Sequence, residues 1–151
     1  MANSQAIATS FKVDLLNGIH AFGTTVVRAG TTADTFKAAL FLASGSLGAA
    51  TTAYSVTSEV SGTNYTAGGV TVTNATAPNS SGTTAFWTPS ASFAWTTVTL
   101  STAFDAVLIY NSTQSDKAVG VYTFGSQTVT AGNFTLTMPT NDATTGLLRL
   151  A

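Results

Sequence analysis

Hydrophobic and polar residues alternate along much of this chain with a period of two, which predicts β-strands. Residues 70–73 and 134–138 place threonine between apolar residues, as strands with one buried and one exposed face do. Residues 34–42 begin in alternation and become almost continuously apolar, which predicts a strand buried on both faces. Residues 147–151 form a last apolar segment, and we expect a final strand there.

Near the N-terminus the period changes, and apolar residues recur at helical spacing over about residues 11–20. The members of this stripe are Phe11, Leu15, Ile19 and Phe22. Ser10 precedes the stripe and can cap a helix, whereas Gly18 weakens it, so we expect one short helix. Residues 1–9 are small and polar without periodicity, and we expect an N-terminal arm or an edge segment there.

The second half of the chain contains several further candidate strands. Two aromatic-rich segments, at residues 86–87 and 93–98, are separated by Pro89. The apolar segments Ala106–Tyr110 and Ala118–Phe124 flank a polar turn, which predicts a hairpin. Each of these four segments is expected to be a separate strand.

Residues 44–69 are dominated by Gly, Ser and Thr, which predicts long loops with a short strand near Tyr54. Strands that follow one another at spacings of about 8–15 residues, with Gly/Ser/Asn turns between them, favour an antiparallel β-sandwich or jelly roll. We therefore expect a mainly β protein. An arm is expected at residues 1–9, and residues 10–151 are expected to form a single β-sandwich domain that begins with one short helix.

The polar residues of this chain are mainly uncharged hydroxyl residues. Only 7% of the residues are charged and 44% are hydrophobic, while the polarity comes from 30 threonines and 15 serines. Average globular domains carry about 25% charged residues. Short hydroxyls can be covered without the cost of several kcal/mol that desolvating an ion carries. The composition therefore indicates a protein whose surface is covered by neighbours.

Several partners and cofactors are disfavoured. Without cysteine, neither a disulfide nor a thiolate metal site can form. The net charge is −1 and the basic residues are scattered, so we expect no nucleic-acid partner. The longest apolar runs are well below the roughly 18–20 residues of a spanning helix, so we expect no membrane partner. The first residues lack the pattern of a secretory signal, and we expect the chain to be used or assembled in a cytoplasm.

No residues with the spacing of a catalytic centre stand out. His20 is the only histidine, and we interpret it as a structural residue at the end of the helix, where the helix dipole favours a cation. The six acidic residues are far apart in the sequence; Asp34 and Asp116 are interpreted as turn residues and Asp105 as an edge residue. We expect no enzyme activity, no cofactor and no metal.

Two further groups could bind a ligand. The glycine-containing segment 62–69 lacks the Gly-Lys-Ser/Thr ending of a phosphate-binding loop, and we interpret it as a wide loop anchored by Tyr65. Trp87, Trp95 and Tyr110 could form a sugar-stacking platform, although aromatic residues more often fill a core. The core interpretation is preferred, and the platform remains the alternative.

Taken in order, segments that span nearly the whole chain resemble small virion structural proteins of tailed bacteriophages. These segments are Ser10–Lys12 with Leu15–Leu16, Asp34–Leu40, Thr52–Tyr54, Glu59–Gly69, Ala106–Ser112, Ala118–Val119 and Leu147–Ala151. The resemblance implies a virion component and transfers no catalytic residues. It leaves the place in the virion open.

Within a virion, we expect a capsid decoration (cement) protein that sits on the capsid surface, bridges capsomers of the major capsid protein and self-associates as a homotrimer. Assembly would take place in the bacterial host cytoplasm. The arm and the C-terminal strand are the natural donors to a neighbour's sheet edge. The candidate assembly contacts are Ala2, Asn3, Ser4, Gln5, Tyr65, Arg149, Leu150 and Ala151. The alternatives are a tail or fibre component that binds a receptor or carbohydrate and, less favoured, a small β-sandwich hydrolase.

Overall fold

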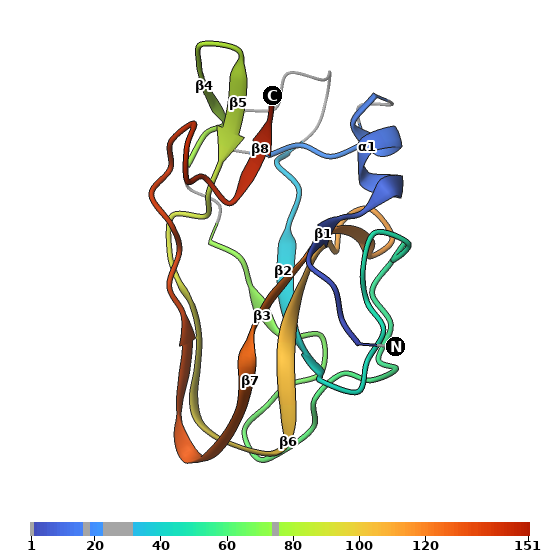
Figure 1. The fold of residues 1–151 in the computed structure, drawn as a ribbon, viewed down its shortest axis with the longest axis vertical. Coiled ribbons are helices and arrows are strands. Elements are labelled where there is room, and N and C mark those ends of the chain that lie inside the picture. The colour runs from blue at the N-terminus through green and yellow to red at the C-terminus, as the bar shows by residue number, and fades with distance from the viewer. Residues whose placement is uncertain (1, 17–18, 23–31, 74–75) are drawn as a thin grey trace.

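The structure, a computed structural model, describes residues 2–16, 19–22, 32–73 and 76–151. Its elements are β1 (Ala6–Ile7), α1 (Thr9–Leu16), β2 (Phe36–Leu42), β3 (Val70–Thr71), β4 (Asn79–Ser81), β5 (Thr84–Trp87), β6 (Phe93–Asn111), β7 (Lys117–Leu136) and β8 (Leu148–Leu150). The strands form a five-stranded sheet in the order β1-β7-β6-β2-β3 and a three-stranded sheet in the order β4-β5-β8 (Figure 1). Every pairing is antiparallel, so the predicted mainly β, antiparallel architecture is confirmed, and a β-sandwich is compatible with it.

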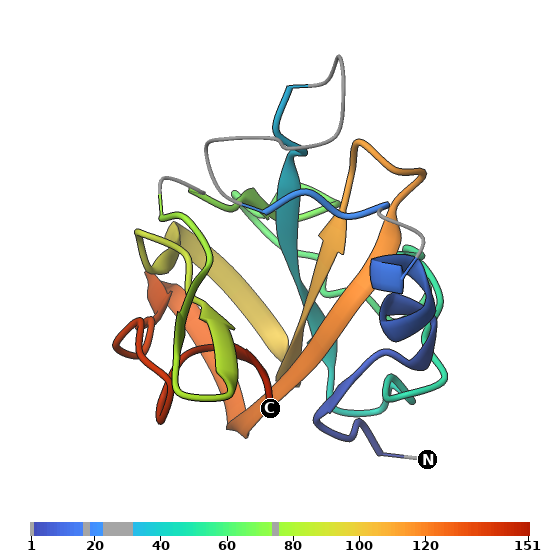
Figure 2. The same ribbon diagram turned by 90° about the horizontal axis from the view of Figure 1, so that it is seen from above.

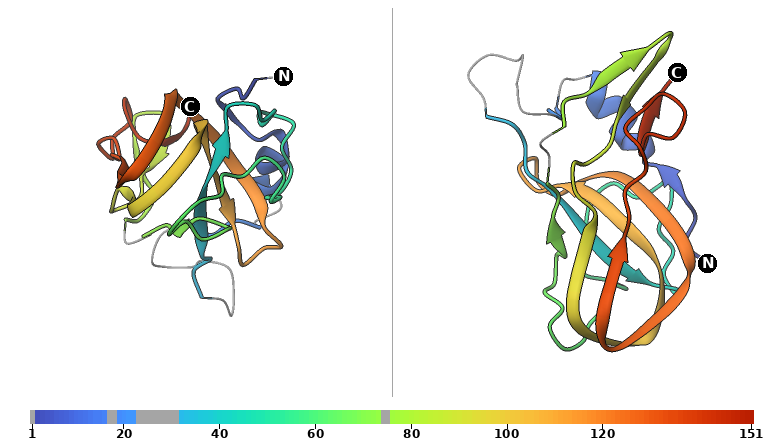
Figure 3. Two further views of the ribbon diagram at one scale, coloured as in Figure 1. Left: turned by 90° about the horizontal axis from the view of Figure 1, so that it is seen from below. Right: turned by 90° about the vertical axis from the view of Figure 1, so that its left-hand side faces the viewer.

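One long hairpin, made of β6 and β7, dominates the fold. The two strands have 19 and 20 residues, and they join segments that the sequence pattern predicts as separate strands. The separation was wrong because the intervening residues stay in the ladder by means of bulges, four of them between Trp95 and Ala106. Bulges bend and twist a strand without ending it. The two halves of the hairpin consequently diverge as the arms of a V (Figures 2 and 3).

Aromatic rings hold the bent hairpin together at its inner face. Phe134 lies 5.0 Å from Phe104 and 5.4 Å from Phe124, measured between ring centroids, and the Trp95 ring lies 5.8 Å away. Because Phe134 belongs to one arm and Phe124 to the other, these contacts set the angle of the bend. The exposed residues that alternate with the buried ones are small or polar, and threonine is the most frequent of them.

Strand β2 is buried on both faces, as its apolar sequence predicts. It pairs with β6 from Phe36 opposite Asn111 to Phe41 opposite Ala106, and four consecutive residues from Ala38 to Phe41 are buried. One face receives side chains from the loop that follows β2, including Tyr54, whose ring packs edge-on against Phe41 at 6.5 Å.

The N-terminal segment departs from its prediction in two ways. Helix α1 ends at Leu16, and Ile19 and His20 beyond it are not helical. Ser10 lies inside the helix and its buried Oγ has no hydrogen-bond partner, so Ser10 is not the cap. The predicted helix breaker, Gly18, lies outside the described residues.

Residues 2–8 lie against the chain's own sheet. Ala6 and Ile7 of β1 pair with Val121 and Gly120 of β7. Of the two interpretations of residues 1–9, the described part matches the edge segment and not a free arm.

A second contact area attaches the small sheet to the large one. Phe22 stacks on Phe36 of β2 at 4.5 Å and contacts Trp87 of β5 at 4.8 Å. The indole nitrogen of Trp87 donates a hydrogen bond to the Thr76 carbonyl at 3.0 Å. The predicted last strand is present as β8, an outer strand of this sheet.

Residues 44–69 are mainly loop, as predicted, but they are tied closely to the sheets. The segment near Tyr54 forms a single bridge, between Ala53 and Lys117, in place of a strand. Gly69 has φ +70°, and a β-carbon there would lie 1.9 Å from the Ala38 carbonyl oxygen. This close approach of two backbones requires glycine.

Candidate functional site

The exposed positions of the hairpin carry no charge, and its two charged residues, Asp105 and Lys117, are half-buried. Residues 60–104 contain no Asp, Glu, Lys, Arg or His, and neither do residues 118–141. Every exposed position of β6 and β7 is Ala, Gly, Ser, Thr, Asn or Gln. These two strands therefore present a broad surface that a neighbour could cover without desolvating an ion.

Three of the six acidic residues are turned inward. Asp14, Asp34 and Glu59 are buried. The Asp105 carboxylate accepts a hydrogen bond of 2.6 Å from the Asn3 amide. Of the charged residues that the structure describes, Arg149 is exposed and five are half-buried, namely Lys37, Asp105, Asp116, Lys117 and Asp142. The fold thus withdraws three of the few charges from the surface.

Asp105 does not occupy a sheet edge, as its sequence context suggested. It lies in β6, between β2 and β7, at the bulge that separates Phe104 from Ala106. The Asn3 amide that binds it also donates to the Leu42 carbonyl at 2.9 Å, and the Asn3 Oδ1 accepts from the Leu47 amide at 3.0 Å. Asn3 is therefore an internal link of the fold.

Glu59 is the centre of a buried hydrogen-bond network. Its Oε1 accepts from the Tyr65 hydroxyl at 2.7 Å and from the Gly68 amide at 2.8 Å, and its Oε2 accepts from the Tyr54 hydroxyl at 2.6 Å. The Tyr65 hydroxyl in turn accepts from the Leu40 amide at 3.0 Å. Burial, together with these bonds to Glu59, raises the pKa of Tyr54 and of Tyr65. Tyr65 anchors the loop, as the sequence predicts.

A second polar cluster surrounds His20. Its Nδ1 lies 3.1 Å from the Asn111 amide nitrogen, and its Nε2 lies 3.7 Å from the Asp14 carboxylate. Lys117 pairs with the same carboxylate at 3.2 Å. The Asp34 carboxylate accepts from the Asn111 amide at 2.9 Å, so Asp34 belongs to this buried cluster and is more than a turn residue.

The His20 cluster has the character of a structural network. The His20 side chain is fully buried, and burial lowers its pKa despite the two nearby carboxylates, so the ring is neutral near pH 7. Rings of Phe11 and Phe36 pack on it at 4.8 and 6.4 Å. The helix-dipole interpretation of His20 is wrong because the helix ends four residues earlier.

Two further classes of site are absent from the described part of the chain. It contains no group of three His, Cys, Asp or Glu residues that could hold a metal ion. Among the same residues, no helix combines the length and hydropathy needed to cross a bilayer.

The sugar-stacking platform does not form. Trp87, Trp95 and Tyr110 are 2%, 4% and 2% exposed and belong to the core. Tyr110 stacks on Tyr54 at 4.6 Å and donates its hydroxyl proton to the Gly68 carbonyl at 2.8 Å. The pKa of Tyr110 is raised to about 12, mainly by burial. The preferred interpretation of these aromatics as core is confirmed.

The candidate assembly contacts fall into two groups. Ala2, Ser4, Gln5, Arg149, Leu150 and Ala151 are exposed. Gln5 and Arg149 border the same cavity of about 240 Å³, so the N-terminal segment and the segment of β8 share this place. Asn3 and Tyr65 are half-buried and bound internally. No contact between copies or with another protein is described, so the assembly role of all eight residues stays a prediction.

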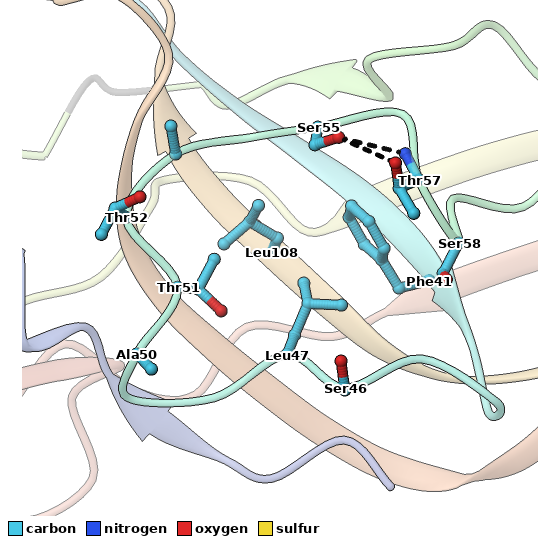
Figure 4. Close-up of a pocket in the computed structure, with 11 residues that line it drawn as sticks. Phe41, Ser46, Leu47, Ala50, Thr51, Thr52, Ser55, Thr57, Ser58 and Leu108 are labelled. Atoms are coloured by element: carbon cyan, nitrogen blue, oxygen red, sulfur yellow. Dashed lines mark hydrogen bonds between the residues drawn. The ribbon is translucent and has the colours of Figure 1, made fainter. Parts of the chain in front are cut away.

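The sequence pattern gave no sign of one further feature, a groove beside β2. The loop from Ser46 to Ser58 runs around Phe41 and Leu108 and encloses about 360 Å³ (Figure 4). Six of its eleven lining residues carry a hydroxyl and none is charged. Hydroxyl residues scattered over a loop have no spacing that predicts a cavity.

No family model, curated protein or solved structure matches the chain. The contacts and surfaces of the chain itself therefore carry the inference about its function.

Proposed function

We propose that the protein is a structural component of a bacteriophage virion, a decoration (cement) protein that binds the major capsid protein at the capsid surface. The observation that carries this proposal is the absence of charge from the exposed positions of β6 and β7, combined with the burial of three of the six acidic residues. A surface of hydroxyl and small side chains is wetted when the protein is free. It can also be covered over a large area without leaving unpaired ions.

The open edges of the two sheets support the same proposal. Strands β1 and β3 are the outer strands of the large sheet, and β4 and β8 are the outer strands of the small one. An outer strand can accept or donate main-chain hydrogen bonds to a neighbouring chain. Self-association as a homotrimer, with contacts at Gln5 and Arg149, is part of the proposal.

The decisive experiment is to measure the number of copies in purified particles by quantitative mass spectrometry. A decoration protein is expected at a copy number comparable with that of the major capsid protein. A copy number that is a small fraction of it would refute the decoration role and favour the tail or fibre alternative.

A charge placed on the proposed contact surface tests the physical argument. In Thr102→Glu the substituted residue is exposed on β6, and the matched control Ser115→Glu is an exposed residue on the turn between β6 and β7. Burying an unpaired carboxylate costs about 3 kcal/mol or more, so we expect Thr102→Glu to bind particles at least about 100-fold more weakly than the wild type. Equal binding by the wild type and both variants would contradict a contact through this surface.

A further inference from the structure

The groove beside β2 combines an apolar floor with a hydroxyl rim. Its large apolar side chains are Phe41, Leu47 and Leu108. Phe41 and Leu108 are 1% and 0% exposed, so the half-buried Leu47 is the one that a ligand can reach. The hydroxyl residues are Ser46, Thr51, Thr52, Ser55, Thr57 and Ser58. Figure 4 shows Leu47 and Leu108 within the ring of the loop and the hydroxyls of Ser46 and Thr51 directed toward its middle.

Backbone hydrogen bonds hold the loop in place from several sides. The Ala43 amide donates to the Ala103 carbonyl of β6 at 3.0 Å, and the Leu42 amide donates to the Ser58 carbonyl at 2.9 Å. On the opposite side, the Ala118 amide of β7 donates to the Thr52 carbonyl at 3.0 Å.

The N-terminal segment fixes a third side of the loop. The Ser4 amide donates to the Leu47 carbonyl at 2.8 Å. The loop is therefore attached to both strands of the hairpin and to the N-terminal segment. The groove is preformed, and a ligand would not have to bear the cost of ordering it.

The hydroxyls of the rim include several that are available to a ligand. Within the described residues, the side chains of Ser46, Thr52 and Ser58 make no hydrogen bond, and Thr51 uses its oxygen as an acceptor for the Gly48 amide, which leaves its proton free. The nearest buried acid in sequence, Glu59, is fully engaged with its own partners.

These features select the chemical class of the ligand. A charged ligand would lose its hydration without meeting a counter-ion, and a purely apolar ligand would bury the hydroxyls without partners. A sugar ring has an apolar C–H face and a rim of hydroxyls, which matches the floor and the rim of this groove. The volume of about 360 Å³ lies in the range of small-molecule sites.

We propose that this groove binds one ring of a neutral sugar, with the apolar face of the sugar on Leu47 and its hydroxyls bonded to Ser46 and Thr51. This site is independent of the capsid-binding surface. A hexose has only a dozen non-hydrogen atoms, so we expect a Kd of about 1–10 mM.

The test is a titration of the ¹⁵N-labelled full chain, followed by ¹H–¹⁵N NMR. The probes are the methyl α-glycosides of glucose, mannose and galactose, with glucuronic acid as the charged comparison. We expect saturable shifts of amides in the 46–58 loop with at least one neutral glycoside, and at least tenfold weaker binding of glucuronic acid.

Two tyrosine substitutions locate the site. Ser46→Tyr fills the groove from its exposed rim and is expected to abolish the shifts, with Thr52→Tyr as a second blocking variant in case the first one unfolds. Ser126→Tyr is the matched control, an exposed serine on β7 that is not among the lining residues, and is expected to bind as the wild type does.

Several results would overturn the proposal. They are the absence of saturable shifts with all three glycosides, shifts that map outside the loop, preferential binding of the charged sugar, and unchanged binding by a folded blocking variant. Loop shifts that depend on protein concentration alone would assign the groove to a second copy of the chain and would equally refute sugar binding. The particle copy number is unaffected by any of these outcomes, so the two proposals fail separately.

Discussion

Removal of the Glu59 carboxylate by Glu59→Ala is expected to destabilise the protein strongly. The side chain is 7% exposed and accepts three short hydrogen bonds, from the hydroxyls of Tyr54 and Tyr65 and from the amide of Gly68. The alanine variant leaves these donors without their acceptor. These hydrogen bonds also attach the loop to β2, since the Tyr65 hydroxyl accepts a hydrogen bond from the Leu40 amide.

The magnitude follows from how easily water can replace the carboxylate at each donor. Tyr54 is half-buried, so water can reach its hydroxyl and the cost there is small. The Gly68 amide is buried, and Tyr65 is half-buried with its hydroxyl facing Leu40. An unsatisfied buried donor costs about 1–3 kcal/mol. We therefore expect a loss of about 3–5 kcal/mol in the free energy of unfolding.

The assay is equilibrium unfolding in urea together with thermal unfolding. In a domain of this size each kcal/mol corresponds to about 2–4 °C, so the expected decrease in Tm is roughly 6–20 °C. A double-mutant cycle with Tyr65→Phe isolates the contact, because the phenylalanine removes only the hydroxyl. The tyrosine substitution should cost at least about 1 kcal/mol less in the Glu59→Ala background than in the wild type.

Asp116→Asn serves as the matched control, since Asp116 is a half-buried acid in the turn between β6 and β7. It should change the free energy of unfolding by less than about 0.5 kcal/mol. A Glu59→Ala variant that loses less than about 1 kcal/mol, or a cycle with strictly additive effects, would show that the network does not hold the loop.

Three further predictions address the other buried groups. Burial lowers the pKa of His20, so the folded state binds fewer protons than the unfolded state as the pH falls below 6.5. The free energy of unfolding should therefore be highest above pH 6.5 and decline below it. Urea unfolding of His20→Asn should show a weaker decline between about pH 6.5 and 5. Gly69→Ala should lower the free energy of unfolding by more than about 3 kcal/mol, because its β-carbon would clash with the backbone. Gly82 has φ +58° and open space around it, so Gly82→Ala should lower it by about 1–2 kcal/mol in the same assay. Trp87→Ala should cost about 3–5 kcal/mol of stability, measured by thermal unfolding, since the indole is buried.

Each of these predictions has a clear contrary result. Stability that is independent of pH between 6.5 and 5 in the wild type would show that His20 is not buried in its neutral form. Equal costs for the two glycine substitutions would argue against the close approach of the backbone at Gly69. A Trp87→Ala variant of wild-type stability would indicate that the indole is exposed, as the sugar-stacking alternative requires.

The sequence pattern alone was sufficient for the mainly β, antiparallel class and for the burial of β2 and of Trp87, Trp95 and Tyr110. Alternation of threonine with apolar residues marks strands because successive side chains point to opposite faces. The unbroken apolar run of β2 indicated burial on both faces for the same reason, and this burial is observed. The loop at 62–69 and its anchor, Tyr65, were also predictable, because the glycines and the missing motif left few alternatives.

Contacts between distant residues decided the rest. No local pattern distinguishes two separate strands from one strand with bulges, so the continuous hairpin of β6 and β7 had to be seen in the pairing. The meeting of Asp14, His20 and Asn111, and the capture of Asp105 by Asn3, join residues that are far apart in the sequence. Their burial and partners depend on the fold.

The low charge of the chain is a property of composition, but its physical meaning depends on where the charged groups lie. Composition shows how few ions there are, and it limits the electrostatic contribution of any surface. Only the tertiary structure directs Asp14, Asp34 and Glu59 inward and leaves hydroxyls on the outer face of the long hairpin. The physical reason is that the direction of a side chain is set by its strand pairing and register, which are formed by residues that the local sequence does not contain.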